Sequence, residues 1–85
     1  MMEVRVLFFA SLKDAVGRDE LTVEVPASGG LDALLDALAV KLPETAMLAL
    51  TSENVRLAVN QQLVGGPFQL AADDEVAFLP RVTGG

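Results

Sequence analysis

The sequence has 85 residues, of which 52% are hydrophobic, and a formal net charge of −6 at pH 7. This length allows one domain with a small core, and the negative charge disfavours nucleic acid and anionic membranes as partners. The absence of cysteine and histidine excludes disulfides and thiolate catalysis, and it removes the commonest metal ligand. No apolar run approaches the ~20 residues of a membrane span. The early run VRVLFFASL lacks a basic leader, so we expect a soluble cytoplasmic protein.

The first predicted strand covers residues 4–9, where side chains alternate with the period of a β-strand. One of its faces carries β-branched and aromatic side chains, namely Val4, Val6 and Phe8. From Leu7 onward both faces are apolar. The segment SLKDAVG follows and predicts a single helical turn, which Ser11 can cap and Gly17 can close in a left-handed conformation.

A second alternating strand is predicted for residues 20–25, ELTVEV, and a proline ends it. After the loop ASGG, an α-helix of about three turns is predicted from leucines with helical spacing. These are Leu31, Leu34, Leu35, Leu38 and Leu42. Asp32 and Lys41 lie at the ends that the helix dipole favours, and Pro43 stops the helix. We expect residues 44–54 to form a loop with at most a short helical turn.

The last third of the chain predicts a hairpin and a final strand. Residues 55–59 form the third strand, Asn60-Gln61 can make a two-residue turn, and QLV gives a short fourth strand. In the connection that follows, Phe68 and Leu70 are expected to point inward. The last strand, EVAFL, begins after a turn at two aspartates.

This order of elements predicts an α+β domain of two layers, with one main helix packed across one face of a mixed sheet of about five strands. The helix leucines need an apolar surface, and ten strand side chains can supply it. These are Val4, Val6, Phe8, Leu21, Val23, Val25, Leu57, Val59, Val76 and Phe78. We expect the domain to cover residues 1–80 and a flexible tail to cover residues 81–85.

The face of the sheet opposite the helix is expected to be polar, but three apolar side chains interrupt it. Simple alternation places Phe9 and Leu79 on this face, at the end of the domain where the tail leaves, and Leu63 can join them. A contiguous exposed apolar patch usually marks a contact surface. The alternative is a twist or bulge that turns Phe9 into the core.

The chain ends in Pro80, a short spacer and the pair Gly84-Gly85. Without Cβ atoms this pair can enter a slot too narrow for other residues, and residues 80–85 extend at most ~20 Å. The terminal carboxylate is ionised at neutral pH, so it must be activated before it can react, for example as an acyl-adenylate. It can then accept sulfur or form an amide. The alternative is an inert, disordered terminus.

Three segments together resemble the small subunit of molybdopterin synthase, the MoaD family. They are VRVLFFASLKDAVG, VRLAVNQQLV and DDEVAFLPRVTGG, and the resemblance covers essentially the whole chain in order. It implies a ubiquitin-like β-grasp fold. It also implies that an E1-like, MoeB-like enzyme uses ATP to adenylate Gly85, and that a sulfurtransferase donor supplies sulfur for its thiocarboxylate. No cofactor is expected to stay bound.

The resemblance further implies that the tail enters the large, MoaE-like subunit of a heterotetramer. There the sulfur passes to cyclic pyranopterin monophosphate during molybdenum cofactor biosynthesis. Gly84 lets the tail pass a narrow channel, and the large subunit supplies the catalytic residues. The residues expected to contact partners are Phe9, Leu63, Leu79, Pro80 and Arg81. Relatives often have proline where this chain has Arg81, whose side chain can pair with an acid or phosphate or remain solvated.

Two alternative functions stay open at this point. The first is a carrier of the same fold that serves another acceptor, in thiamin thiazole synthesis, a cysteine pathway, tRNA thiolation or protein conjugation. Thiamin carriers typically lack the segment LFFASLKDAVG, which favours the molybdopterin hypothesis. The second alternative is a β-grasp binding module with an inert tail.

Overall fold

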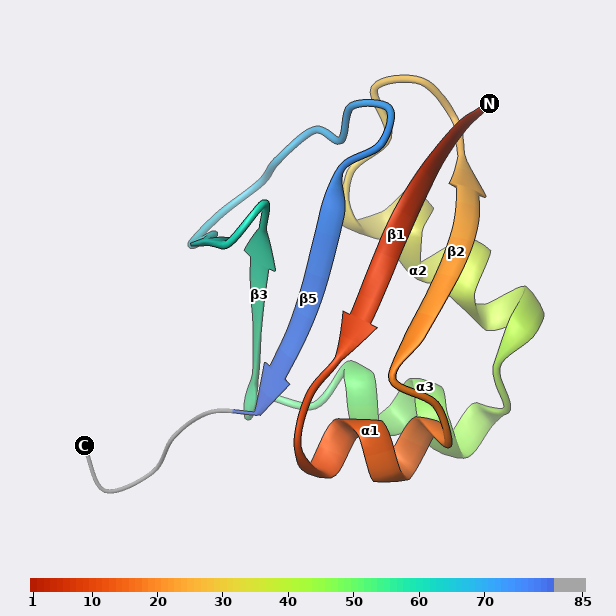
Figure 1. Ribbon diagram of the computed structural model, residues 1–85, viewed down its shortest axis with the longest axis vertical. Coiled ribbons are helices and arrows are strands. Elements are labelled where there is room, and N and C mark those ends of the chain that lie inside the picture. Colours follow the sequence, from red (N-terminus) through yellow and green to blue (C-terminus); the bar gives the residue numbers. More distant parts are fainter. Residues whose placement is uncertain (81–85) are drawn as a thin grey trace.

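The computed structural model describes residues 1–80, which form a five-stranded sheet with strand order β2-β1-β5-β3-β4 (Figure 1). Strands β1 and β5 are parallel, and the other neighbouring strands are antiparallel. The strands are β1 (Met2–Phe8), β2 (Glu20–Val25), β3 (Val55–Val59), β4 (Gln62–Leu63) and β5 (Glu75–Pro80). The helices are α1 (Ser11–Val16), α2 (Leu31–Lys41) and α3 (Glu44–Leu50). This is the predicted mixed α+β sheet, in a ubiquitin-like β-grasp arrangement.

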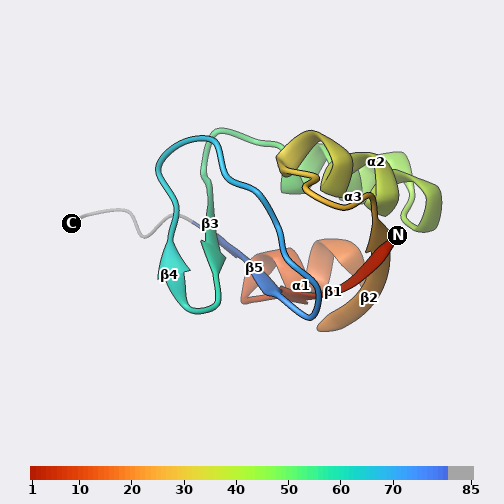
Figure 2. The same ribbon diagram turned by 90° about the horizontal axis from the view of Figure 1, so that it is seen from above.

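Helices α2 and α3 lie on one side of the sheet, as Figure 2 shows. Helix α1 lies at the end of the sheet where β1 and β5 finish, and the N-terminus is at the opposite end (Figure 1). The opposite face of the sheet carries no helix among residues 1–80. None of the helices described for these residues is long and apolar enough to cross a membrane.

The core lies between the sheet and the helices, largely as the alternation predicts. Its strand side chains are Val4, Val6, Phe8, Leu21, Val23, Val25, Val76 and Phe78, all buried. The rings of Phe8 and Phe78 stack with centroids 5.9 Å apart, which ties the end of β1 to the end of β5. Leu57 and Val59 of β3 are only partly buried.

The leucine stripe of α2 is narrower in the structure than the spacing predicts. Only Leu34 and Leu38 are fully buried, whereas Leu35 and Leu42 are half-buried and Leu31 is exposed. The burial of these leucines differs because α2 packs mainly against β2 and leaves the β3 side of the sheet less covered. Leu31 and Leu35 instead line a shallow hollow beside β3.

Two local predictions are wrong. Residues 44–50 form a helix, α3, rather than a loop, because Ala46 and Leu50, one turn apart, are both buried against the rest of the core. Ser11 does not cap α1, since the N-cap residue is Ala10 and no side chain caps the helix. The prediction for the other end of α1 is confirmed, because Gly17 closes it with a φ of 88°.

The predicted hairpin turn is confirmed and is tied to the start of β5. Asn60 and Gln61 have φ values of 50° and 69°, as a two-residue type I′ turn requires. The Asn60 side-chain amide donates to Asp74 Oδ1 over 2.9 Å, and the Glu75 amide donates to Asn60 Oδ1 over 3.0 Å. The carboxylate of Asp74 also accepts a hydrogen bond from the Ala71 amide over 2.8 Å. These bonds fix the turn that precedes β5.

The loop before α2 contains a close backbone approach that explains Gly30. A Cβ atom added to Gly30 would lie 2.5 Å from the Phe68 carbonyl oxygen. The Leu70 amide donates to the Gly29 carbonyl over 2.8 Å, so the two segments are bonded side by side. Phe68 is half-buried and Leu70 is buried, as expected for the connection before β5.

We therefore expect Gly30→Ala to lower the free energy of unfolding by about 1–3 kcal/mol, because backbone must move to admit the methyl group. Urea titration of the purified protein measures this change. Gly65→Ala is the matched control, since nothing lies within 4 Å of its added Cβ, and it should leave stability nearly unchanged. Equal urea midpoints for the two variants would contradict the close approach of Gly30 to the Phe68 carbonyl.

Candidate functional site

The face of the sheet without helices carries a row of side chains that crosses all five strands. The pairing register aligns Glu20 of β2, Leu7 of β1, Ala77 of β5, Ala58 of β3 and Leu63 of β4. Four of the five are apolar. The methyl groups of the two alanines are buried, while Leu7 is half-buried and Leu63 is 61% exposed.

A second row lies closer to the end where β5 finishes. The Phe9 amide donates to the Phe78 carbonyl over 3.2 Å, which extends the pairing of β1 with β5 by one residue. Phe9 is 43% exposed, and Leu79 is half-buried. Arg56 is the partner of Leu79 on β3. The two rows form an apolar patch, which we call the open-face patch, made of Leu7, Phe9, Ala58, Leu63, Ala77 and Leu79.

Charged side chains replace the apolar ones farther from this end of the sheet. Arg5 and Glu75 are neighbours in the parallel pairing of β1 with β5, and their side chains form an ion pair of 2.6 Å. Thr22 is the partner of Arg5 on β2. The open face is therefore apolar where β5 ends and polar toward the other end, so the apolar part lies beside the point where the chain continues past Pro80.

Comparison with known proteins assigns the chain to a family. The model of the family described as ThiS matches residues 6–85. The chain belongs to the ThiS family. It is 40% identical over 84 residues to the protein named molybdopterin synthase sulfur carrier subunit of Escherichia coli, which covers 96% of this chain and 99% of that protein. The resemblance to the molybdopterin synthase small subunit is therefore confirmed.

Solved structures support the same fold for this ThiS-family chain. The small archaeal modifier protein 1 of Methanosarcina acetivorans is 26% identical, with a TM-score of 0.76, and the likeness covers 100% of this chain and 98% of that one. A chain in the complex of subunits 1 and 2 of molybdopterin-converting factor from Helicobacter pylori is 24% identical, with a TM-score of 0.66. That likeness covers 99% of this chain and 100% of the other.

The structure brings together the predicted contact residues that lie among residues 1–80. Phe9 and Leu79 lie on the open face, as alternation predicts, and Phe9 is not turned into the core. Leu63 shares this face, and Pro80 ends β5 beside it. The other three predicted site residues, Arg81, Gly84 and Gly85, lie outside the described residues. Their roles, and the contact role of the patch, remain predictions.

Sequence reasoning missed three members of the patch, namely Leu7, Ala58 and Ala77. Their alternation was visible, but it does not show which strands are neighbours. Only the parallel pairing of β1 with β5 places Leu7 beside Ala77. The ThiS-family chain therefore has a wider apolar surface than Phe9, Leu63 and Leu79 alone indicate.

Proposed function

We propose that this chain is the sulfur-carrier small subunit of molybdopterin synthase. In this role the carboxylate of Gly85 is the reacting group, and the folded body delivers it to two different enzymes. The observation that carries the proposal is the match to the carrier subunit of Escherichia coli over 96% of this chain, at 40% identity. The family match also runs through Gly85.

The proposed chemistry has two steps before sulfur transfer. An E1-like enzyme joins the Gly85 carboxylate to the α-phosphate of ATP, which gives an acyl-adenylate and releases pyrophosphate. A sulfurtransferase-bound persulfide then displaces AMP and forms an acyl disulfide between Gly85 and the donor. A thiol cleaves the sulfur–sulfur bond of this intermediate, which leaves a thiocarboxylate on Gly85 and a disulfide on the donor. The thiocarboxylate sulfur passes to cyclic pyranopterin monophosphate in the large subunit. Gly84 lets the last residues pass through a narrow channel, and ATP is consumed by the activating enzyme.

The open-face patch fits docking onto such partners. It is apolar, partly exposed and adjacent to the last described residue before the tail, so a protein seated on it also receives the tail. The Helicobacter pylori relative was solved as a complex of subunits 1 and 2 of molybdopterin-converting factor. We infer that a large subunit covers the patch in this protein, and that the activating enzyme uses the same patch.

A second candidate is a carrier that is joined to other proteins through the same terminus. It is favoured by the likeness to small archaeal modifier protein 1, with a TM-score of 0.76. The two candidates share activation of Gly85 and differ in the acceptor. Sulfur transfer to the pterin supports the first, and an isopeptide bond to a lysine supports the second.

Mass spectrometry tests the proposal directly. The chain is incubated with a matching activating enzyme, ATP and a sulfur donor. We expect the intact mass to rise by the difference between one sulfur and one oxygen atom, with the change located in the C-terminal peptide. The same mixture without ATP is the control. An unchanged mass, under conditions that convert a known carrier, would contradict the proposal.

A further inference from the structure

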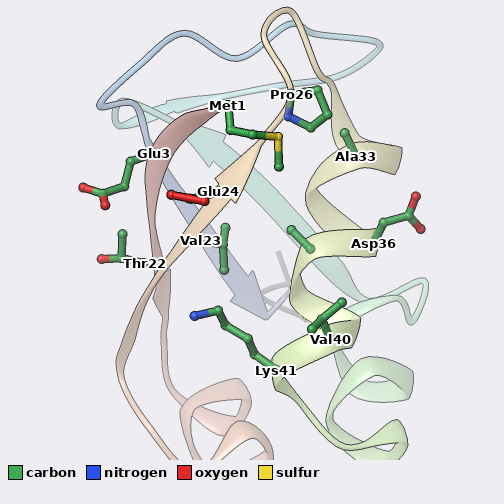
Figure 3. Close-up of a pocket in the computed structure, with 11 residues that line it drawn as sticks. Met1, Glu3, Thr22, Val23, Glu24, Pro26, Ala33, Asp36, Val40 and Lys41 are labelled. Carbon is green, nitrogen blue, oxygen red and sulfur yellow. The ribbon is translucent and has the colours of Figure 1, made fainter.

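A groove lies between the edge strand β2 and helix α2, away from the open-face patch. Its volume is about 670 Å³, and its walls come from the N-terminal residues, β2 and α2. Figure 3 shows Val40 and Asp36 on the helix side, and Lys41 extending from the end of α2 toward β2. Val40 is 86% exposed, so its apolar side chain is available to a segment that enters the groove.

The backbone groups on the outer edge of β2 point toward this groove. The Phe8 amide donates to the Asp19 carbonyl over 2.9 Å, which makes this a hydrogen-bonded pair of the β1–β2 ladder. Hydrogen-bonded pairs alternate along an antiparallel ladder. The amides and carbonyls of Glu20, Thr22 and Glu24 therefore face away from β1. Thr22 and Glu24 both line the groove, so an extended segment can bond to them as an added strand.

The charges around the groove favour a basic occupant. Glu3 and Glu24 are direct partners in the pairing of β1 with β2, and like charges in this position destabilise a sheet. The lining residues in the described part of the chain carry three carboxylates, those of Glu3, Glu24 and Asp36, against two ammonium groups, those of Lys41 and of the Met1 amino terminus. A lysine or arginine from an added strand would lie beside Glu24 on the open face and relieve this repulsion.

The other face of an added strand would meet apolar surface. Its alternate side chains would point toward α2, where Ala33, Ala37 and Val40 line the groove. We propose that the groove between β2 and α2 is a second docking site, which binds an extended segment of a partner protein with alternating basic and apolar residues. The segment joins the sheet at β2, and its apolar side chains cover Val40.

A second copy of this chain fits the groove poorly. Two β2 edges paired about Thr22 in antiparallel fashion would place Glu20 of each opposite Glu24 of the other, which is repulsive. The site is also separate from the open-face patch, because it lies at the opposite edge of the sheet from β4 and its described lining residues all belong to residues 1–41. A partner could therefore hold the carrier there while the open-face patch is covered.

The probe for this site is a blocked peptide of alternating lysine and valine, as long as β2. It is titrated into the full chain, and amide hydrogen exchange is followed by NMR. We expect the amides of Thr22 and Glu24 to exchange at least about tenfold more slowly with bound peptide, while Val23, which bonds to β1, is unchanged. A peptide of the same composition with all lysines before all valines is the control for unspecific charge attraction, and it should give no protection.

A pair of surface variants tests where the peptide binds. Val40→Lys removes the apolar wall of the groove and should weaken binding about tenfold. Leu48→Lys is matched to it in charge and exposure, since Leu48 is 64% exposed on α3 outside the groove, and it should bind as the unmodified chain does. The proposal would be overturned if both variants weakened peptide binding equally, or if the peptide protected amides of the open-face patch instead. Self-association of the chain through β2 would also overturn it. Deleting Gly85 should not change peptide binding, which separates this site from the proposed sulfur carrier role.

Discussion

Deleting Gly85 is expected to abolish sulfur acceptance and transfer while leaving the folded body unchanged. The deletion moves the terminal carboxylate back by one residue, or about 3.5 Å along an extended chain. Reacting atoms must approach within about 3–3.5 Å, and a misplacement of about 1 Å can cost 10²-fold in rate. We therefore expect the rate of thiocarboxylate formation to fall by at least about 10³-fold. Single-turnover mass spectrometry with the activating enzyme measures it.

Two controls separate chemistry from folding in this experiment. Adding one alanine after Gly85 displaces the carboxylate in the opposite direction and should cause a similar loss. Both variants should keep the thermal midpoint of the unmodified chain, because the core described among residues 1–80 has its buried side chains between Val4 and Phe78. A deletion variant that still supports pterin synthesis would show that the tail is inert and that the domain acts as a binding module.

Local patterns predicted most of the strands and turns. Strand β2 has the predicted bounds, Glu20–Val25, because period-two alternation is broken sharply by the following proline. Asn60-Gln61 adopts the expected turn, since a short polar stretch, residues 60–62, separates two apolar runs. Helix α2 begins at Leu31 because the leucine spacing starts there. In each case the information lies within a few neighbouring residues.

The features that sequence reasoning missed depend on contacts between distant segments. Helix α3 is short, and its burial depends on contacts with α1 and α2, so its own seven residues are a weak signal. The need for glycine at position 30 arises from the carbonyl of Phe68, which is remote in sequence. Strand order is equally non-local, because the parallel pairing of β1 with β5 joins the two ends of the domain.

In the candidate site, too, local patterns predicted some residues, whereas others depend on contacts between distant segments. Alternation alone placed Phe9 and Leu79 on the open face, since each follows a residue of the predicted core. The contribution of Leu63 required the hairpin register, which pairs it with Ala58. The edge groove beside β2 could not be predicted, because no local pattern shows which strand lies at the edge of a sheet.

Phe9→Ala is expected to weaken binding to the large subunit of molybdopterin synthase by about 30-fold or more. Aromatic anchors near the centre of an interface typically contribute about 2 kcal/mol or more, which corresponds to this factor. Phe9 lies beside Leu79 in the open-face patch and is 43% exposed in the free chain. Its loss should therefore affect the complex more than the fold. Isothermal titration calorimetry and urea unfolding of the same sample measure the two quantities.

Leu63→Ala gives the cleaner form of this test, because Leu63 is 61% exposed on the short strand β4 and contributes little to the core. We expect about tenfold weaker binding with stability nearly unchanged. Leu48→Ala is the matched control, since Leu48 is 64% exposed on α3, which lies on the other side of the sheet (Figure 2), and it should affect neither quantity. Two results together would contradict this role of the patch. They are a loss of unfolding free energy in Phe9→Ala as large as its loss of binding free energy, and normal binding by Leu63→Ala. The patch would then belong to the edge of the core, and the partner would dock elsewhere.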